Sequence, residues 1–111
     1  MFLSGKTEDA LSAVRHVTDG HPNHARAQNL LGAACATLGR GDCARAAFEA
    51  SLRANPRDPS TYVNLGRFCL ESGSPQDAAD YFAEALTIDP QSSGARDGLT
   101  QARSLVATNP R

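Results

Sequence analysis

Residues 59–90 read PSTYVNLGRFCLESGSPQDAADYFAEALTIDP, and the landmarks of this stretch recur along the chain with a fixed 34-residue period. The recurring positions are Gly5, Gly39 and Gly73, then Ala10, Ala44 and Ala78, then Pro22, Pro56 and Pro90. A period of this length is typical of stacked helical units, because each unit buries its apolar face only against its neighbours. Stacked units present an extended surface, so the sequence predicts a binding scaffold and not a catalytic pocket.

Apolar residues between these landmarks fall at helical spacing. Ala44, Ala47, Phe48 and Leu52 share one helix face, and a second set repeats the pattern from Ala78 onwards. The sequence predicts an all-α chain of about six helices, with no strand. The expected helices are 7–19, 24–38, 42–54, 59–72, 75–88 and 93–107.

Residue types at the helix ends support these boundaries. Asp42 and Ser74 are expected N-caps, and Pro75 suits the first position of a helix. Gly39 and Gly73 fit the left-handed conformation that commonly ends a helix. The short connections predict that successive helices pack antiparallel as hairpins.

Small and large residues alternate in a way that suits close helix packing. Gly32 is expected opposite Ala44, and Gly66 opposite Ala78, so that the two helices of a pair approach closely. The large Phe48 and Phe82 are expected to fill the space toward the next unit.

These residues carry a family resemblance. The pattern Asn29-Leu-Leu-Gly32, Ala44, Phe48 and Pro56 resembles the tetratricopeptide repeat, and so does Tyr62-Val-Asn-Leu-Gly66 with Ala78, Phe82, Ala85 and Pro90. The resemblance implies a superhelical solenoid of antiparallel helix pairs, forming a single domain over 1–111. Its expected parts are a partial repeat at 1–24, full repeats at 25–58 and 59–92, and a capping helix at 93–107. The sequence departs from the family pattern at Gln28, and at Cys35 and Cys69, where an aromatic residue is usual.

In this family the first helix of each pair lines a concave groove, which implies a partner-binding surface here. The implied groove residues are Arg26, Asn29, Ala33 and Thr37 in the first repeat, Ser60, Val63, Asn64, Arg67 and Glu71 in the second, and Asp97 and Gln101 in the capping helix. Amides there would pair with a peptide backbone, and arginines with its carboxylates. The alternative is that these are solvated surface residues without a dedicated ligand.

Some members of the family clamp the terminal carboxylate of chaperone tails with two Lys, two Asn and one Arg. The corresponding positions here are Asn29, Ala33, Asn64, Gly94 and Gly98. Only Asn64 matches and no cation is present, so the chaperone-clamp interpretation is rejected.

Composition narrows the function classes further. The formal net charge is -1, so no overall field attracts nucleic acid or an anionic membrane, and no apolar run is long enough for membrane insertion. Lys6 is the one lysine among the basic residues, a bias that points to a GC-rich, bacterial coding sequence. No export signal is visible, which leaves the cytoplasm and the bacterial periplasm both open.

No motif in the chain indicates catalysis, so we expect no catalytic residue, no cofactor and no metal site. His16, His21 and His24 cluster near a turn, but no further ligand completes a metal-binding set. Three cysteines are an odd number, which argues against a disulfide framework. Cys35 and Cys69 are expected to be small buried hydrophobic residues, and Cys43 to begin a helix, without a redox function.

The N-terminal part has an incomplete repeat. The helix expected at 7–19 lacks most of its hairpin partner, so its apolar face would be half uncovered. We expect the chain to be a fragment of a longer array, or two copies to form a homodimer through residues 1–20.

The most consistent function is a protein–protein interaction scaffold that holds a peptide or helix of a partner protein in the groove. Two alternatives stay open. The chain is a substrate-positioning segment of a larger enzyme of the glycosyltransferase or sulfotransferase type, or it is a self-associating structural module.

Overall fold

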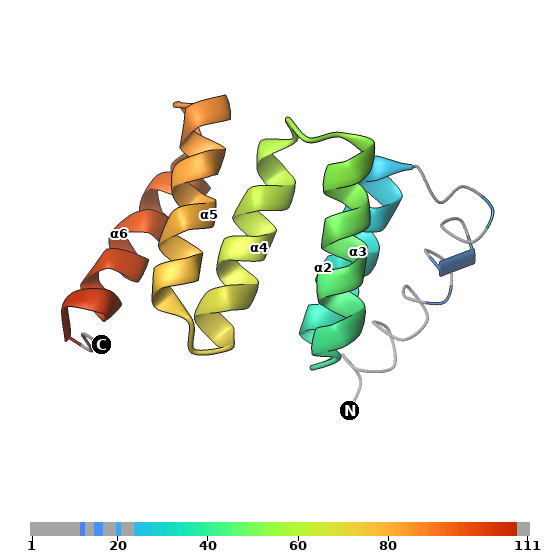
Figure 1. Ribbon diagram of the computed structural model, residues 1–111, viewed down its shortest axis with the longest axis horizontal. Helices are drawn as coiled ribbons and strands as arrows, with labels where there is room; N and C mark the ends of the chain where they lie inside the picture. The colour runs from blue at the N-terminus through green and yellow to red at the C-terminus, as the bar shows by residue number, and fades with distance from the viewer. Residues whose placement is uncertain (1–11, 13–14, 17–19, 21–23, 109–111) are drawn as a thin grey trace. The chain divides into compact units, whose positions relative to one another are not determined.

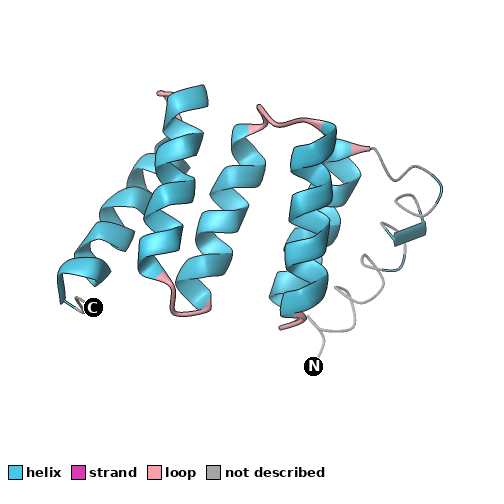
Figure 2. Cartoon of the chain, in the orientation of Figure 1, coloured by secondary structure: helices cyan, strands magenta, loops and turns pink. Residues whose placement is uncertain are grey.

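The computed structural model describes residues 12, 15–16, 20 and 24–108, and within that part every regular element is an α-helix (Figures 1 and 2). The helices are α2 (Ala25–Thr37), α3 (Gly41–Ala54), α4 (Pro59–Glu71), α5 (Pro75–Ile88) and α6 (Ser93–Thr108). The predicted all-α class is confirmed, and each of these helices begins and ends within one residue of its predicted bounds. The helix predicted at 7–19, and with it the dimer surface at 1–20, lies mostly outside the described residues. No described helix combines the length and apolar character needed to cross a bilayer.

The chain forms two compact units that divide at Pro56–Arg57. The first described hairpin, α2 with α3, belongs to one unit, and α4, α5 and α6 belong to the other. This division lies beside the predicted repeat boundary at 58/59. Whether the two units form a single domain depends on how they pack against each other. The single domain over 1–111 therefore stays a prediction.

Backbone geometry explains where the first helix of each hairpin ends. Gly39 and Gly73 adopt positive φ angles of 75° and 80°, as predicted. This conformation turns the chain back, so that the N–H of the residue after the glycine donates to a carbonyl in the last turn of the preceding helix. Arg40 N–H donates to the Cys35 carbonyl and Ser74 N–H to the Cys69 carbonyl, each at 2.8 Å. The two hairpins therefore close with the same turn.

The starts of the second helices were predicted with mixed success. Ser74 is the N-cap of α5 and Pro75 its first residue, as expected. Asp42 is not a cap: α3 begins at Gly41, and its N-cap is Arg40. The reason is that the Arg40 carbonyl already accepts the helical hydrogen bond from Ala44 N–H, at 3.0 Å. The Asp42 carboxylate instead lies in the first turn, where it interacts favourably with the helix dipole.

Among the described residues, each unit contains one fully buried phenylalanine ring, Phe48 in the first and Phe82 in the second. In the first unit, a Cβ built on Gly32 would lie 2.5 Å from the Phe48 ring, and in the second a Cβ on Gly66 would lie 2.7 Å from Phe82. Phe82 also lies against Gly98 of α6, and it is 0% exposed. The glycines therefore make room for a ring of their own hairpin. The alanines predicted opposite them are buried, but they are not the nearest atoms.

Two contacts between α2 and α3, a hydrogen bond and a disulfide, were not predicted from the sequence. The buried Ser51 hydroxyl on α3 donates to the Ala25 carbonyl at the start of α2, at 2.9 Å. Cys35 and Cys43 form a disulfide between α2 and α3, with their Cα atoms 5.8 Å apart. Cys35 is buried, as expected, but the expectation against a disulfide is wrong, because the tight turn at Gly39 brings the two cysteines together. Cys69 is buried, as expected, and takes part in no disulfide.

Candidate functional site

In the first unit, the candidate groove residues all lie on α2, but they are not equally accessible. Arg26 and Thr37 are exposed and Ala33 is half-buried, whereas Asn29 is only 8% exposed. The Thr37 hydroxyl donates to the Ala33 carbonyl at 3.0 Å, as helical threonines often do. A ligand on this face would therefore meet Arg26 and the small side chains before it met Asn29.

The same helix carries an exposed apolar residue that the sequence analysis did not select. Leu30 is 55% exposed, the most exposed large hydrophobic residue in the described part of the chain. It stands one repeat period before Asn64 and so occupies an equivalent repeat position. Because Asn64 was a candidate groove residue, the 34-residue period could have identified Leu30 as one too. Leu30 adds apolar contact area to the helix that carries the Arg26 charge.

In the second unit, the candidate residues come from α4 and α6. Ser60, Arg67 and Glu71 are exposed and Asn64 is half-buried, while Val63 is 9% exposed. On α6, Asp97 and Gln101 are exposed. Asp58 caps the N-terminus of α4: its carboxylate accepts hydrogen bonds from Ser60 N–H at 3.0 Å and from the Ser60 hydroxyl at 2.7 Å.

The faces of α4 and α6 meet at Gly94. A Cβ built on Gly94 would lie 3.6 Å from a guanidinium nitrogen of Arg67 and 3.8 Å from a methyl carbon of Val63. Because Gly94 has no side chain, the Arg67 guanidinium can approach the backbone of α6. The structure therefore places a cation beside the backbone of α6 and the almost fully buried Val63 side chain, and Asp97 follows one turn further along α6.

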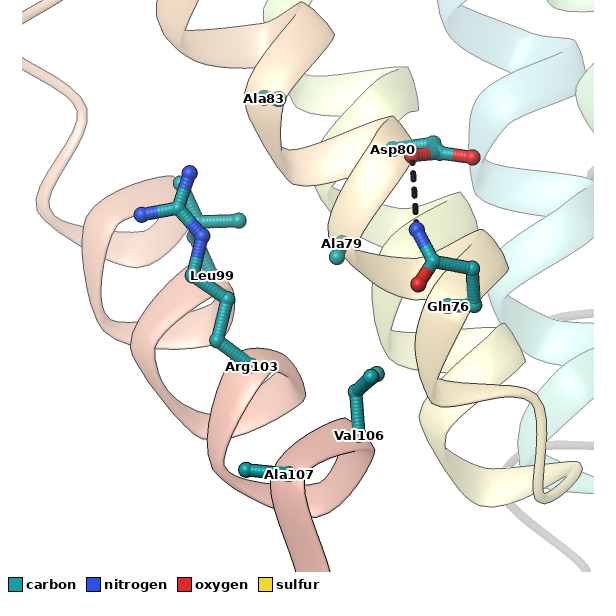
Figure 3. Close-up of a pocket in the computed structure, with 8 residues that line it drawn as sticks. All are labelled: Gln76, Ala79, Asp80, Ala83, Leu99, Arg103, Val106 and Ala107. Atoms are coloured by element: carbon teal, nitrogen blue, oxygen red, sulfur yellow. Dashed lines mark hydrogen bonds between the residues drawn. The ribbon is translucent and has the colours of Figure 1, made fainter. Parts of the chain in front are cut away.

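A separate cleft lies between α5 and α6, with a volume of about 340 Å³ (Figure 3). It is lined by the apolar residues Ala79, Ala83, Leu99, Val106 and Ala107 and by the polar residues Gln76, Asp80 and Arg103. The Gln76 amide donates to the Asp80 carboxylate at 3.3 Å across one turn of α5. Leu99 and Val106 of α6 line this cleft. The fully buried residues of this helix are Ala95, Gly98 and Ala102.

Metal-ligating side chains do not gather anywhere in the described part of the chain in a set of three or more. His24, one of the three histidines near the turn, has a local structural role. It is the N-cap of α2, and its Nδ1 accepts a hydrogen bond from Ala27 N–H at 3.2 Å. His21 lies outside the described residues.

Comparison with solved structures identifies similar folds. The first tetratricopeptide domain of Spaghetti (RPAP3), solved with the HSP90 peptide SRMEEVD, superposes with a TM-score of 0.86 at 17% identity, over 96% of this chain and 84% of that one. A Thermobaculum terrenum O-GlcNAc transferase gives a TM-score of 0.82 at 25% identity, over 89% of this chain. The present chain spans only 19% of that transferase.

Comparison at the sequence level gives the family. A search of curated proteins finds no match. The tetratricopeptide repeat model matches residues 4–59 and 38–93, two overlapping segments that together extend over most of the chain. The repeat period, the glycine–phenylalanine packing and this match agree, and the chain belongs to the tetratricopeptide repeat family.

Proposed function

We propose that this chain binds a peptide segment of a partner protein on the exposed faces of α4 and α6, and that the exposed face of α2 is a second contact surface. The observation that carries the proposal is the position of Arg67, whose guanidinium lies over Gly94 beside the Val63 side chain. A cation in this position suits a ligand that brings a carboxylate. On α2, Arg26 supplies a second exposed cation and Leu30 an exposed apolar side chain.

The chemistry of these faces favours an extended peptide with acidic side chains. Arginine binds carboxylates with two parallel hydrogen bonds, which fixes the orientation of the ligand as well as attracting it. Asn64 and Gln101 supply amides that suit the backbone of an extended segment, and Ser60 supplies a hydroxyl. The peptide bound in the RPAP3 domain, SRMEEVD, is itself acidic, which supports this class of ligand for a chain of the same fold.

The proposed binding mode differs from a chaperone-type carboxylate clamp. Two of the five clamp positions are Gly94 and Gly98 in this chain. Gly98 is buried, and any side chain there would overlap the Phe82 ring. The cation of this surface comes instead from Arg67 on α4. We therefore expect internal acidic segments, and not a free chain terminus, to be the preferred ligands.

Affinity capture with charge-reversed variants tests the proposal. The immobilised chain is compared with an Arg26→Glu, Arg67→Glu double variant, and captured proteins from the host lysate are identified by mass spectrometry. Each lost charged hydrogen bond is worth about 1.5–3 kcal/mol, so the double variant should bind its partners at least about 100-fold more weakly. Circular dichroism of the variant should match that of the wild type.

The matched control reverses the same number of charges on α3. Arg45→Glu with Arg53→Glu changes two exposed residues of the second helix of the hairpin. Partners retained by this control and lost by the first variant support the proposed faces. Partners that persist with the first variant, or that are lost equally with both, would refute it.

A second candidate function is substrate positioning within a larger enzyme. It is favoured by the 25% identity to the O-GlcNAc transferase. The matched part is 19% of the transferase chain, so most of that protein lies outside the match. In that case the same arginines would hold an acidic segment of the substrate protein near a catalytic domain elsewhere in the protein. The full reading frame decides between the two, because a fused catalytic domain is required by this candidate and not by the first.

A further inference from the structure

The disulfide between α2 and α3 joins two cysteines whose surroundings are very different. Cys35 lies near the end of α2 and is 0% exposed, whereas Cys43 lies in the first turn of α3 and is half-buried. The Cα atoms are 5.8 Å apart, within the range that a disulfide spans without movement of the backbone. The turn at Gly39 sets this distance, since Arg40 N–H donates to the Cys35 carbonyl. The backbone turn therefore holds the two cysteines close together.

Two features favour negative charge on the Cys43 sulfur when the bond is reduced. The Arg15 guanidinium donates to Cys43 Sγ at 3.3 Å. Cys43 is also the third residue of α3, where the unsatisfied amides of a helix N-terminus attract an anion. A thiol beside an arginine at a helix start is the kind that reacts as a thiolate. Cys35 has neither advantage, because it is buried near the end of its helix.

We propose that Cys43 and Cys35 are a reversible redox pair, in which Cys43 is the reactive thiol toward small disulfides and Cys35 is the thiol that resolves the product. The Cys43 thiolate attacks one sulfur of a low-molecular-weight disulfide such as oxidised glutathione. A mixed disulfide forms on Cys43, and the other half leaves as a thiolate. The Cys35 thiol then attacks Cys43 Sγ, the second half leaves, and the Cys35 proton passes to it. One disulfide has been reduced to two thiols, and one has formed between α2 and α3.

The second hairpin is a natural comparison for this pair. Cys69 stands one repeat period after Cys35 and is likewise buried, but the residue equivalent to Cys43 is Asp77. The hairpin of α4 and α5 therefore has the buried thiol but not the second cysteine. The pair is a property of the first repeat and is not required by the repeat fold. Oxidation would fasten α2 to α3 and leave α4 and α5 unchanged.

Peptide mapping after oxidation tests the proposal on the full chain. The reduced protein is incubated with oxidised glutathione, free thiols are blocked with N-ethylmaleimide, and the protein is digested with trypsin. Cleavage after Arg40 places the three cysteines on separate peptides, which are 27–40, 41–45 and 68–96. We expect peptides 27–40 and 41–45 to be joined in the wild type. Cys69, on peptide 68–96, should remain blocked by the maleimide.

Single cysteine variants assign the order of the steps. In Cys35→Ser, glutathione should remain attached to peptide 41–45, because nothing displaces it. In Cys43→Ser, peptide 27–40 should stay free of glutathione over the same period. The proposal is overturned if Cys35 reacts as fast in Cys43→Ser as Cys43 does in Cys35→Ser, or if the wild type gives no joined peptides.

A kinetic variant that keeps both cysteines tests the role of the arginine. Arg15→Gln should slow the modification of Cys43 roughly fivefold, the factor expected for one unit charge a few ångströms away in water. Arg53→Gln removes the same charge from the far end of α3 and should leave the rate unchanged. Equal rates for Arg15→Gln and the wild type would remove the basis for assigning Cys43 as the reactive thiol.

Discussion

Alanine at position 98 should destabilise the second unit, whereas alanine at position 94, one turn earlier in α6, should not. A Cβ on Gly98 would overlap three carbons of the buried Phe82 ring, and the same three ring carbons lie within 2.9 Å of a Cβ built on Gly66. The ring therefore has no room to move away from α6 toward α4. At Gly94 the nearest atoms are at 3.6 Å and 3.8 Å, which is ordinary contact.

The size of the difference follows from two opposing terms. Overpacking a well-filled core costs about 1–3 kcal/mol. Alanine in place of glycine in a helix gains about 0.5–1 kcal/mol, somewhat less in the first turn, where Gly94 lies. We therefore expect Gly98→Ala to lower the free energy of unfolding by about 1 kcal/mol and Gly94→Ala to raise it by up to about 0.5 kcal/mol.

Urea denaturation followed by circular dichroism measures both variants against the wild type. A difference of about 1.5 kcal/mol between them also corresponds to several degrees in Tm for a chain of this size. Equal stabilities, or a Gly98→Ala variant more stable than Gly94→Ala, would show that the Phe82 ring is not confined between α4 and α6.

Three further substitutions test individual contacts by the same denaturation assay. Asp58→Ala removes the side-chain cap of α4 and should cost about 1 kcal/mol, while Ser74→Ala, at a cap without a side-chain hydrogen bond, should cost much less; equal losses would contradict the capping role. Ser51→Ala removes the buried hydrogen bond to the Ala25 carbonyl and should cost about 1 kcal/mol, so an unchanged midpoint would show that the bond contributes nothing. Gly73→Ala places a Cβ at a φ of 80° and should cost about 1–2 kcal/mol, and a stabilised variant would contradict the left-handed turn.

The helices and their ends could be predicted from the sequence because their causes are local. The spacing of apolar residues, Pro75 at a helix start, and Gly39 and Gly73 at helix ends all act within one turn of the chain. The glycines and the apolar spacing also recur from one repeat to the next, so the helices predicted in one repeat support those predicted in the other. The exception, Asp42, shows the limit of local reasoning. The turn that ends α2 determines where α3 begins, and an acidic residue near the start of a helix does not.

The repeat register also identified which helix faces are candidates for binding, since equivalent positions in a repeat face the same way. It did not show which of those residues are reachable. Asn29 and Leu30 are neighbours in sequence, yet the first is 8% exposed and the second 55% exposed. Exposure depends on what packs against each side chain, and residues distant in the sequence decide that.

What the sequence determined by itself is the family, the helix pairs and the recurrence of glycine and phenylalanine in both hairpins, because a regular period fixes which residue types recur on each face. The tertiary structure alone decided that Phe82 is shared between Gly66 and Gly98, that Arg67 extends over Gly94, and that Cys35 is bonded to Cys43. Each of these is a distance between atoms on different helices. Such distances depend on how closely two helices approach and on the turn that joins them, and residue spacing along one helix does not specify either.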